Sequence, residues 1–203
     1  FVRSMASRGG KGGLSLKAQE TGDILDAAGF DVIIFETVGV GQIELDVVKA
    51  TDTVVVVLVP ESGDEVQMLK AGLMEIGDIF AINKSDRLGS DKLMLTLKNV
   101  LSTATYKDSE WVPEVIQTIA IEDKGIDSLI NSINYHKQNI NQNNIRRIKI
   151  DERYKKSIND LITENYMNTF WNNINLKKLN DELSKDNNER LSPYELTLSL
   201  IEK

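Results

Sequence analysis

The stretch FDVIIFETVGVGQ, residues 30–42, decides the predicted fold. Its apolar run Val32–Phe35 predicts a buried β-strand that ends at Glu36. A tight turn containing Gly39 and Gly41 follows. A carboxylate at the carboxyl end of a buried strand, followed by a glycine whose N–H can approach a ligand closely, suits a Mg²⁺-phosphate site in an open α/β sheet. The stretch therefore predicts one half of a nucleotide switch.

Strand and helix patterns alternate on either side of this stretch. The runs TVVVVLVP, residues 53–60, and Ile79–Ile82 are continuous and apolar, as in parallel strands that helices cover on both faces. A last strand is expected at Val115–Ile121. The order predicts an α/β fold built from right-handed β-α-β units. Helices are expected at about 14–28, with Gly29 as C-cap, at 43–50 and 62–76, and at 126–135, where Ile126, Leu129, Ile130 and Ile133 face inward.

The chain begins with a glycine-rich region. Phe1–Ala6 alternates as at the end of a strand, and because no initiator Met precedes it we expect further sequence upstream. Lys11 lies in a run that starts like a phosphate-binding loop, but Ser15 and Leu16 occupy the positions of the second glycine and the lysine that such a loop requires. We therefore interpret the run as a strand-to-helix turn, with phosphate binding by Lys11 as the alternative.

The motif Asn83-Lys84-Ser85-Asp86 directly follows the predicted strand Ile79–Ile82. An aspartate held edge-on accepts two hydrogen bonds from N1–H and N2–H₂ of guanine, a pattern that adenine cannot offer. We expect Asp86 to read this edge, Asn83 to brace the loop, and the stem of Lys84 to lie along the purine face. The alternative is a surface turn, because such a tetrapeptide also arises by chance in a chain rich in Asn, Lys and Asp.

The loop after the last predicted strand supplies the second half of the predicted base site. Where a guanine loop exists, a backbone N–H just past this strand meets guanine O6, and Ala120 is placed for that contact. We therefore include Ile119, Ala120 and Ile121 among the nucleotide-binding residues. The alternative is that Ala120 is only a small residue at the end of a strand.

Charge and composition disfavour several classes of function. At 203 residues, the chain can form one domain with a sizeable core and an appendage. The net charge of −7 and the pI of about 4.9 disfavour binding to nucleic acid and to anionic membranes. The chain has no cysteine, which excludes disulfides and thiolate metal sites, and its longest apolar run, Val54–Val59, is too short to span a bilayer. We expect a cytoplasmic protein without nucleic-acid or membrane partners.

A change in composition near His136 predicts a domain boundary there. Residues 1–136 contain 12 Lys and Arg against 21 Asp and Glu, whereas residues 137–203 contain 12 against 10. The second part is predicted to hold an amphipathic helix over about 145–174 and another helix that begins at Ser192-Pro193. The longer helix must bury its apolar stripe on a partner or on the chain's own core, and the stripe consists of Tyr154, Ile158, Leu161, Ile162, Tyr166 and Phe170.

The single histidine, His136, invites a metal-binding interpretation. One histidine without cysteine cannot build a transition-metal site by itself. We therefore expect His136 to be a surface or packing residue.

Taken together, these stretches resemble a known family. The chain is similar to the SIMIBI-class P-loop GTPases that serve as chaperones for adenosylcobalamin-dependent methylmalonyl-CoA mutase, relatives of which are often labelled arginine/ornithine (LAO/AO) transport ATPases or kinases. The resemblance implies a P-loop NTPase-like α/β fold, a mostly parallel sheet flanked by helices, with a C-terminal all-α extension. It covers about residues 1–136 and rests on FVRSMASRGGKGGLS, AAGFDVIIFETVGVGQIELDV and DTVVVVLVPESGDEVQMLKAGLMEIGDIFAINKSDR.

The resemblance also implies an activity and the residues that carry it. It implies GTP as the substrate, Mg²⁺ as the metal, and a GTP-hydrolysing chaperone that gates adenosylcobalamin loading and protects the mutase. Glu36 would help to hold Mg²⁺ through its water shell, and Gly39 would sense the γ-phosphate. Gln42 would orient water, although a glutamine here equally suits fixing the turn.

Contacts with partners are implied as well. Residues 63–70 resemble an extra switch that relays the nucleotide state to the mutase. Asp64 and Lys70 are its charged members, with a helix cap and a solvated lysine as the alternatives. Residues 137–203 resemble the arm through which the family forms homodimers.

Two departures from the family pattern bear on these implications. The Walker A loop should lie upstream of Phe1, so residues 1–136 correspond to a GTPase domain without that segment. We expect this polypeptide alone to bind GTP poorly and not to hydrolyse it. Ile119 replaces the usual Ser before Ala120, which bears on side-chain support for the guanine loop but not on the backbone contact. The alternatives are an arginine/ornithine transport ATPase or kinase and a non-catalytic dimerising module.

Overall fold

The computed structural model describes residues 1–4, 16–37, 50–60, 73–103 and 111–201. Contacts divide the chain into two compact units, Phe1–Ile150 and Asp151–Lys203. The boundary expected near His136 lies inside helix α6 (Ile126–Gln142), and the division by contacts falls inside helix α7 (Ile145–Phe170). Whether the GTPase and dimerisation roles divide at residue 136 stays a prediction.

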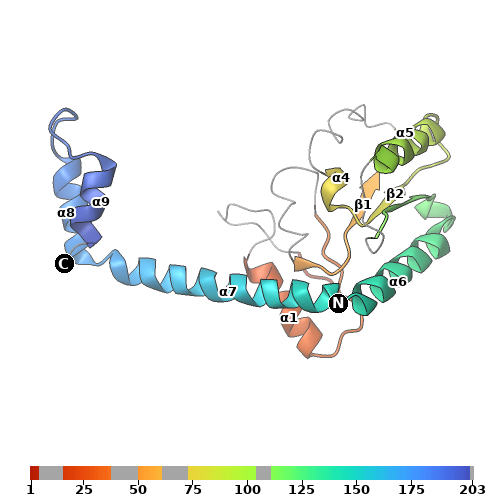
Figure 1. The fold of residues 1–203 in the computed structure, drawn as a ribbon, viewed down its shortest axis with the longest axis horizontal. Helices are drawn as coiled ribbons and strands as arrows, with labels where there is room; N and C mark the ends of the chain where they lie inside the picture. Colours follow the sequence, from red (N-terminus) through yellow and green to blue (C-terminus); the bar gives the residue numbers. More distant parts are fainter. Residues whose placement is uncertain (5–15, 38–49, 61–72, 104–110, 202–203) are drawn as a thin grey trace. The chain divides into compact units, whose positions relative to one another are not determined.

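A three-stranded parallel sheet forms the centre of the first unit (Figure 1). Its strands are β1 (Val55–Leu58), β2 (Ile79–Ile82) and β3 (Glu114–Gln117), in the order β1-β2-β3. All four residues of β2 are buried, as expected of a central parallel strand whose sequence is apolar throughout. The predicted parallel α/β architecture is therefore confirmed.

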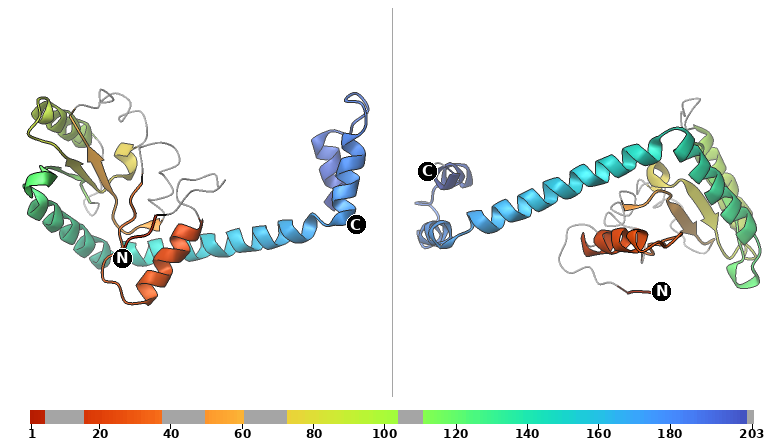
Figure 2. Two further views of the ribbon diagram at one scale, coloured as in Figure 1. Left: turned by 180° about the vertical axis from the view of Figure 1, so that it is seen from behind. Right: turned by 90° about the horizontal axis from the view of Figure 1, so that it is seen from below.

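Helices α5 (Ser90–Thr103) and α6 pack against the two faces of this sheet (Figures 1 and 2). Phe80 and Ile82 of β2 belong to the core on the α5 side, so the alternation of side chains turns Ile79 and Ala81 toward the opposite face. No helix was predicted over residues 90–103, although leucines recur there at intervals of four. The core on the α5 side consists of Val54, Val56, Leu58, Phe80, Ile82, Leu93, Leu97 and Leu101.

The stretch expected to form the first strand, Val32–Phe35, is not a strand in the structure. It follows helix α1 (Leu16–Ala27). Gly29, just beyond this helix, has φ +86° and matches the predicted C-cap. Val32 and Ile34 are 73% and 84% exposed. A strand exists only where a neighbouring strand completes its hydrogen bonds, and among the described residues none pairs with this stretch. A strand end was expected at Phe1–Ala6, and its described part, residues 1–4, is irregular and exposed, again without a paired strand among the described residues.

Two further predicted elements differ from the structure in their bounds or in the face that they bury. Strand β3 ends at Gln117 rather than at Ile121, because the chain turns there into a short 3₁₀ helix, η1 (Ala120–Glu122). Helix α6 buries Ser132, His136 and Ile140, whereas Ile130, which was expected to face inward, is half exposed. Polar contacts of His136 set the rotation of this helix, and apolar spacing alone does not reveal them.

Other predicted helices lie partly outside the described residues. The helix expected at 62–76 corresponds to α4 (Leu73–Ile76) as far as it is described. The helix expected at 43–50 lies outside the described residues, apart from Ala50.

The second unit is helical, as predicted. It contains most of α7, together with α8 (Asn173–Leu183) and α9 (Pro193–Ile201), which pack on each other. Ser192 caps α9 as expected: its hydroxyl accepts the N–H of Glu195, and the Glu195 carboxylate accepts the Ser192 N–H at 3.0 Å. The buried Glu182 carboxylate accepts the Leu191 N–H at 2.7 Å, which fastens the loop to α8. No helix of the described residues is long and apolar enough to cross a membrane.

Candidate functional site

Two loops meet at the carboxyl edge of the sheet. Because the three strands are parallel, their carboxyl ends lie at one edge, which is where open α/β sheets bind ligands. The Asn83–Asp86 loop follows β2, and Thr118 begins the loop that follows β3. Gly89, beyond the first loop, lies near Pro60 at the end of β1, since a Cβ added to it would be 3.9 Å from the Pro60 Cβ. The fold therefore gathers the predicted base-binding residues at one edge.

The side chain of Asn83 joins these two loops. Its Oδ1 atom accepts a hydrogen bond from the Ala120 N–H at 3.1 Å and another from the Thr118 hydroxyl at 3.3 Å. The backbone adds a third link, from the Ser85 N–H to the Thr118 carbonyl at 3.1 Å. The Asn83 N–H itself donates to the Leu58 carbonyl at 2.8 Å, so the loop is also tied to β1. The two loops form one hydrogen-bonded unit, centred on an asparagine.

Thr118 is the residue at this site whose role the sequence left open. It is buried, with 4% of its surface exposed, and its hydroxyl donates to Asn83 Oδ1. This is side-chain support of the kind that the Ser-to-Ile change at position 119 brought into question. A hydroxyl residue near the carboxyl end of a predicted strand is the sequence signal that could have found it.

Lys84 and Asp86 are presented to solvent on this scaffold. Both side chains are exposed. Lys84 has φ +56°, a left-handed backbone that costs a non-glycine residue about 1–2 kcal/mol. The Arg87 N–H closes the turn onto the Lys84 carbonyl at 3.0 Å. The strained turn leaves both side chains open to solvent.

The loop after β3 is closed by its own backbone. Ile119 and Lys124 exchange two hydrogen bonds, of 3.0 and 3.3 Å, as an isolated antiparallel bridge. Gly125 follows with φ +75°, and a Cβ there would overlap the carbonyl oxygen of Gln117. The side chain of Gln117 in turn donates to the Ser90 hydroxyl at 2.8 Å, which fixes the loop to the start of α5. Gly125 is therefore required by this turn, and sequence reasoning had not singled it out.

Lys124 brings a positive charge close to the base-binding loops. Its ammonium group lies 2.6 Å from the Glu122 carboxylate. This hydrogen bond raises the pKa of Lys124 above its ordinary value, and the charges of Glu122 and, more weakly, Asp86 add to the effect. The Asp86 carboxylate therefore lies in the field of Lys124, another residue that sequence reasoning had not identified.

The structure places the other predicted residues differently. The Ala120 N–H, expected to meet guanine O6, donates to Asn83 in the structure, so the guanine contact requires this donor to be shared or released. Ile121 is exposed, whereas Ile119 is partly buried. Glu36 is exposed, and among the described residues no hydrogen bond or ion pair joins it to Asn83–Asp86. The structure brings Asn83 and Ala120 together and shows no contact between them and Glu36.

Four of the predicted residues, Gly39, Gln42, Asp64 and Lys70, lie outside the described residues. Within the described parts of the chain, no group of three or more His, Cys, Asp or Glu side chains lies close enough to hold a metal ion. Mg²⁺ commonly keeps several waters and is held by one or two carboxylates together with phosphates. A lone exposed carboxylate at Glu36 thus suits Mg²⁺ only where phosphates supply other ligands.

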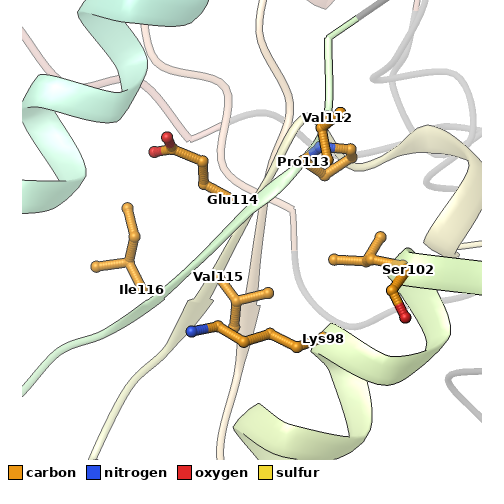
Figure 3. Close-up of a pocket in the computed structure, with 8 residues that line it drawn as sticks. Lys98, Ser102, Val112, Pro113, Glu114, Val115 and Ile116 are labelled. Carbon is orange, nitrogen blue, oxygen red and sulfur yellow. The ribbon is translucent and has the colours of Figure 1, made fainter. Parts of the chain in front are cut away.

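A pocket lies elsewhere on the first unit, between the end of α5 and the start of β3. Figure 3 shows Val115 on the same side of β3 as Lys98 and Ser102, with Glu114 and Ile116 on the other side. None of the residues that line this pocket was predicted to bind nucleotide. It is therefore distinct from the edge where the Asn83 and Thr118 loops meet.

Comparison with known proteins finds relatives that are described as GTPases. The sequence profile of the family described as "Methylmalonyl Co-A mutase-associated GTPase MeaB" matches residues 1–175. A putative GTPase of Pyrococcus horikoshii is 41% identical over 209 residues, covering 100% of this chain and 64% of the relative. The GTPase ArgK of Escherichia coli is 37% identical over 136 residues, covering 66% of this chain and 41% of the relative.

A solved structure has the same fold. The crystal structure of an LAO/AO transport system kinase matches with a TM-score of 0.68 and 28% identity, covering 91% of this chain and 60% of that one. The chain thus spans less than two thirds of the length of each of these proteins.

Proposed function

The chain belongs to the methylmalonyl-CoA mutase-associated GTPase MeaB family, and we propose that it is the guanine-recognising part of a GTP-binding and GTP-hydrolysing chaperone. The observation that carries the proposal is the link from Asn83 Oδ1 to Ala120 and Thr118. This link joins the loops after β2 and β3 at the edge of the sheet where α/β proteins bind ligands.

Guanine recognition follows from the chemistry of these loops. The exposed Asp86 carboxylate offers two acceptors for N1–H and N2–H₂ of guanine, and the aliphatic stem of Lys84 covers the purine face. Asn83 holds both loops in register for these contacts. Adenine presents no donor at its N1 position, so it leaves the carboxylate of Asp86 unpaired.

The phosphates and Mg²⁺ would be held by residues on the amino-terminal side. We assign Glu36 to the Mg²⁺ ion through bound water, Gly39 to the γ-phosphate, and Gln42 to the attacking water. Mg²⁺ would supply charge neutralisation on the phosphates. The exposure of Glu36 supports its assignment, because a carboxylate reaches a hydrated ion only from an accessible position.

The partner in this proposal is an adenosylcobalamin-dependent methylmalonyl-CoA mutase. The nucleotide state would gate cofactor loading and protect the mutase, with Asp64 and Lys70 relaying that state. The family description, which names a mutase-associated GTPase, supports this partner. A cytoplasmic location is part of the proposal, and a chain without cysteine is compatible with that reducing compartment.

Homodimer formation through α7 is part of the proposal. The apolar stripe of α7 is exposed in the single chain; Leu161 and Tyr166, for example, are 56% and 58% exposed. A stripe of this kind on a long helix is suited to burial against a second copy. Replacing Leu161 with Asp is expected to yield monomers in light scattering. Lys156→Asp, at an exposed position with no member of the stripe three, four or seven residues away, should leave the dimer intact, and dimers of both variants would contradict the assignment.

The experiment that tests the proposed function compares GTP with ATP. Protein expressed from the complete reading frame is titrated with fluorescent analogues of both nucleotides, as wild type, as Asp86→Ala and as the control Asp181→Ala. Wild type and the control should prefer the guanine analogue, and Asp86→Ala should lose that preference. An ATP preference would favour the transport ATPase or kinase alternative, and a guanine preference that survives in Asp86→Ala would remove the assignment of Asp86.

A further inference from the structure

The amino ends of the three strands meet helix α6 at His136. Thr53 precedes β1, Asp78 precedes β2, and Trp111 precedes β3. All three contact His136 or its partners. Because the strands are parallel, this cluster lies at the edge of the sheet opposite the Asn83 and Thr118 loops. It takes no part in the proposed nucleotide site.

The imidazole of His136 is buried and contacts the other three residues of the cluster. Its exposed fraction is 2%. The Nδ1 atom lies 2.8 Å from the Thr53 hydroxyl, and Nε2 lies 3.4 Å from Oδ1 of Asp78. The Trp111 indole packs edge-on against the ring, with centroids 4.9 Å apart. A neutral imidazole that accepts from Thr53 and directs its Nε2–H at Asp78 uses both ring nitrogens.

Asp78 fastens the same cluster to the sheet. Its Oδ2 atom accepts the Val54 N–H at 2.8 Å, and its carbonyl accepts the Trp111 Nε1–H at 2.7 Å. One residue therefore connects β1, β2 and the start of β3, and its second carboxylate oxygen faces His136. Loss of the contacts of His136 would remove these side-chain links between α6 and the amino ends of the strands.

We propose that Thr53, Asp78, Trp111 and His136 form an acid-sensitive clasp, which holds α6 on the sheet while the imidazole is neutral and opens when it is protonated. A protonated Nδ1 becomes a donor, so the Thr53 hydroxyl must turn and accept from it in place of donating to it. The added charge is also placed in an interior that offers little water to solvate it.

The charges around the clasp favour the neutral ring. Burial lowers the pKa of His136 below the ordinary value of 6.5, and the nearby Lys149 ammonium on α7 lowers it further. The carboxylates of Asp78 and Asp52 act in the opposite direction. Asp52 is held by α7, with Arg146 Nε 3.2 Å from its carboxylate and Lys149 Nζ 2.9 Å from its carbonyl.

The sign of the pH dependence follows from this lowered pKa. Below pH 6.5 the unfolded chain binds a proton at its histidine that the folded chain does not yet bind. Stability is therefore lost as the pH falls from 6.5 toward the lower pKa of the folded state, and the loss levels off below it. The clasp weakens over the same interval.

The test uses the 203-residue chain, whose single histidine gives one imidazole signal in NMR. With Trp171 replaced by Phe, Trp111 is the sole indole, and its fluorescence should be quenched when the neighbouring imidazole becomes charged. The proposal predicts an imidazole midpoint below 6.5 and a fall in Trp111 emission over the same pH range. A midpoint at or above 6.5, or emission that does not follow it, would overturn the proposal.

Charge and side-chain variants make the test specific. Lys149→Met should raise the imidazole midpoint, whereas the matched control Lys155→Met, an exposed position on the same helix, should leave it unchanged. His136→Gln should remove the pH dependence of Trp111 emission. Emission that falls with pH as strongly in His136→Gln as in wild type would refute the clasp. If His136→Gln does not fold, the lysine variants decide the matter. Equal imidazole midpoints in Lys149→Met and Lys155→Met would then refute the clasp.

Discussion

Replacing Asn83 with alanine removes the acceptor that Ala120 and Thr118 share. The Thr118 hydroxyl is buried, so leaving it unpaired costs about 1–3 kcal/mol, whereas the exposed Ala120 N–H regains water and its loss costs about 0.5–1.5 kcal/mol. We expect Asn83→Ala to lower the free energy of unfolding by roughly 2–3 kcal/mol. Thr118→Val alone should cost about 0.5–1 kcal/mol, because Asn83 keeps its bond to Ala120.

The double variant tests this explanation, because it removes the donor and the acceptor together. Without the orphaned hydroxyl, Asn83→Ala/Thr118→Val should be about 1 kcal/mol more stable than the sum of the two single effects predicts. Urea unfolding of all four proteins, followed by circular dichroism, measures this coupling, with Asn99→Ala on α5 as an exposed asparagine control. Single effects that add to within about 0.3 kcal/mol would show that the two side chains are not coupled.

Three other substitutions test separate parts of the fold. Gly125→Ala should destabilise the first unit by about 2 kcal/mol or more in urea unfolding, because its backbone is left-handed and the new Cβ would overlap the Gln117 carbonyl; a change below about 0.5 kcal/mol would contradict the turn. Ser132→Ala should raise the stability by about 1 kcal/mol, because the buried hydroxyl of Ser132 has no hydrogen-bond partner among the described residues; a loss would imply a bond there. The hydrogen bonds from Lys185 and from the Leu191 N–H lower the pKa of Glu182, so the stability they give to α8 and α9 should be lost in acid below about pH 4.5, and Glu182→Gln should lack this acid-dependent loss in a pH series of thermal unfolding.

The sequence predicted the sheet best where its strands are buried on both faces. Ile79–Ile82 is apolar at every position, and it is the central strand of the structure. Val32–Phe35 is equally apolar but forms no strand, because pairing depends on a neighbour that a local pattern does not reveal. An apolar run therefore marks a segment that can join a sheet, and the presence of a neighbouring strand decides whether it does.

The sequence motif predicted the position of the candidate site, whereas the contacts between its two loops became visible only in the structure. The position of Asn83–Asp86 after a strand was enough to place that loop at the carboxyl edge. The bond between Asn83 and Ala120, and the support from Thr118, depend on the register between β2 and β3. The same holds for His136, whose burial against Thr53 and Asp78 joins residues far apart in the sequence.

The central claim is that one purine lies between the Asn83–Asp86 loop and the loop after β3. A crystal structure of the protein from its complete reading frame, with GDP bound, measures this directly. We expect the Asp86 carboxylate within hydrogen-bond distance of guanine N1 and N2, and the Ala120 N–H within reach of O6. A guanine base bound elsewhere on the sheet, or an Asp86 carboxylate turned away from it, would contradict the claim.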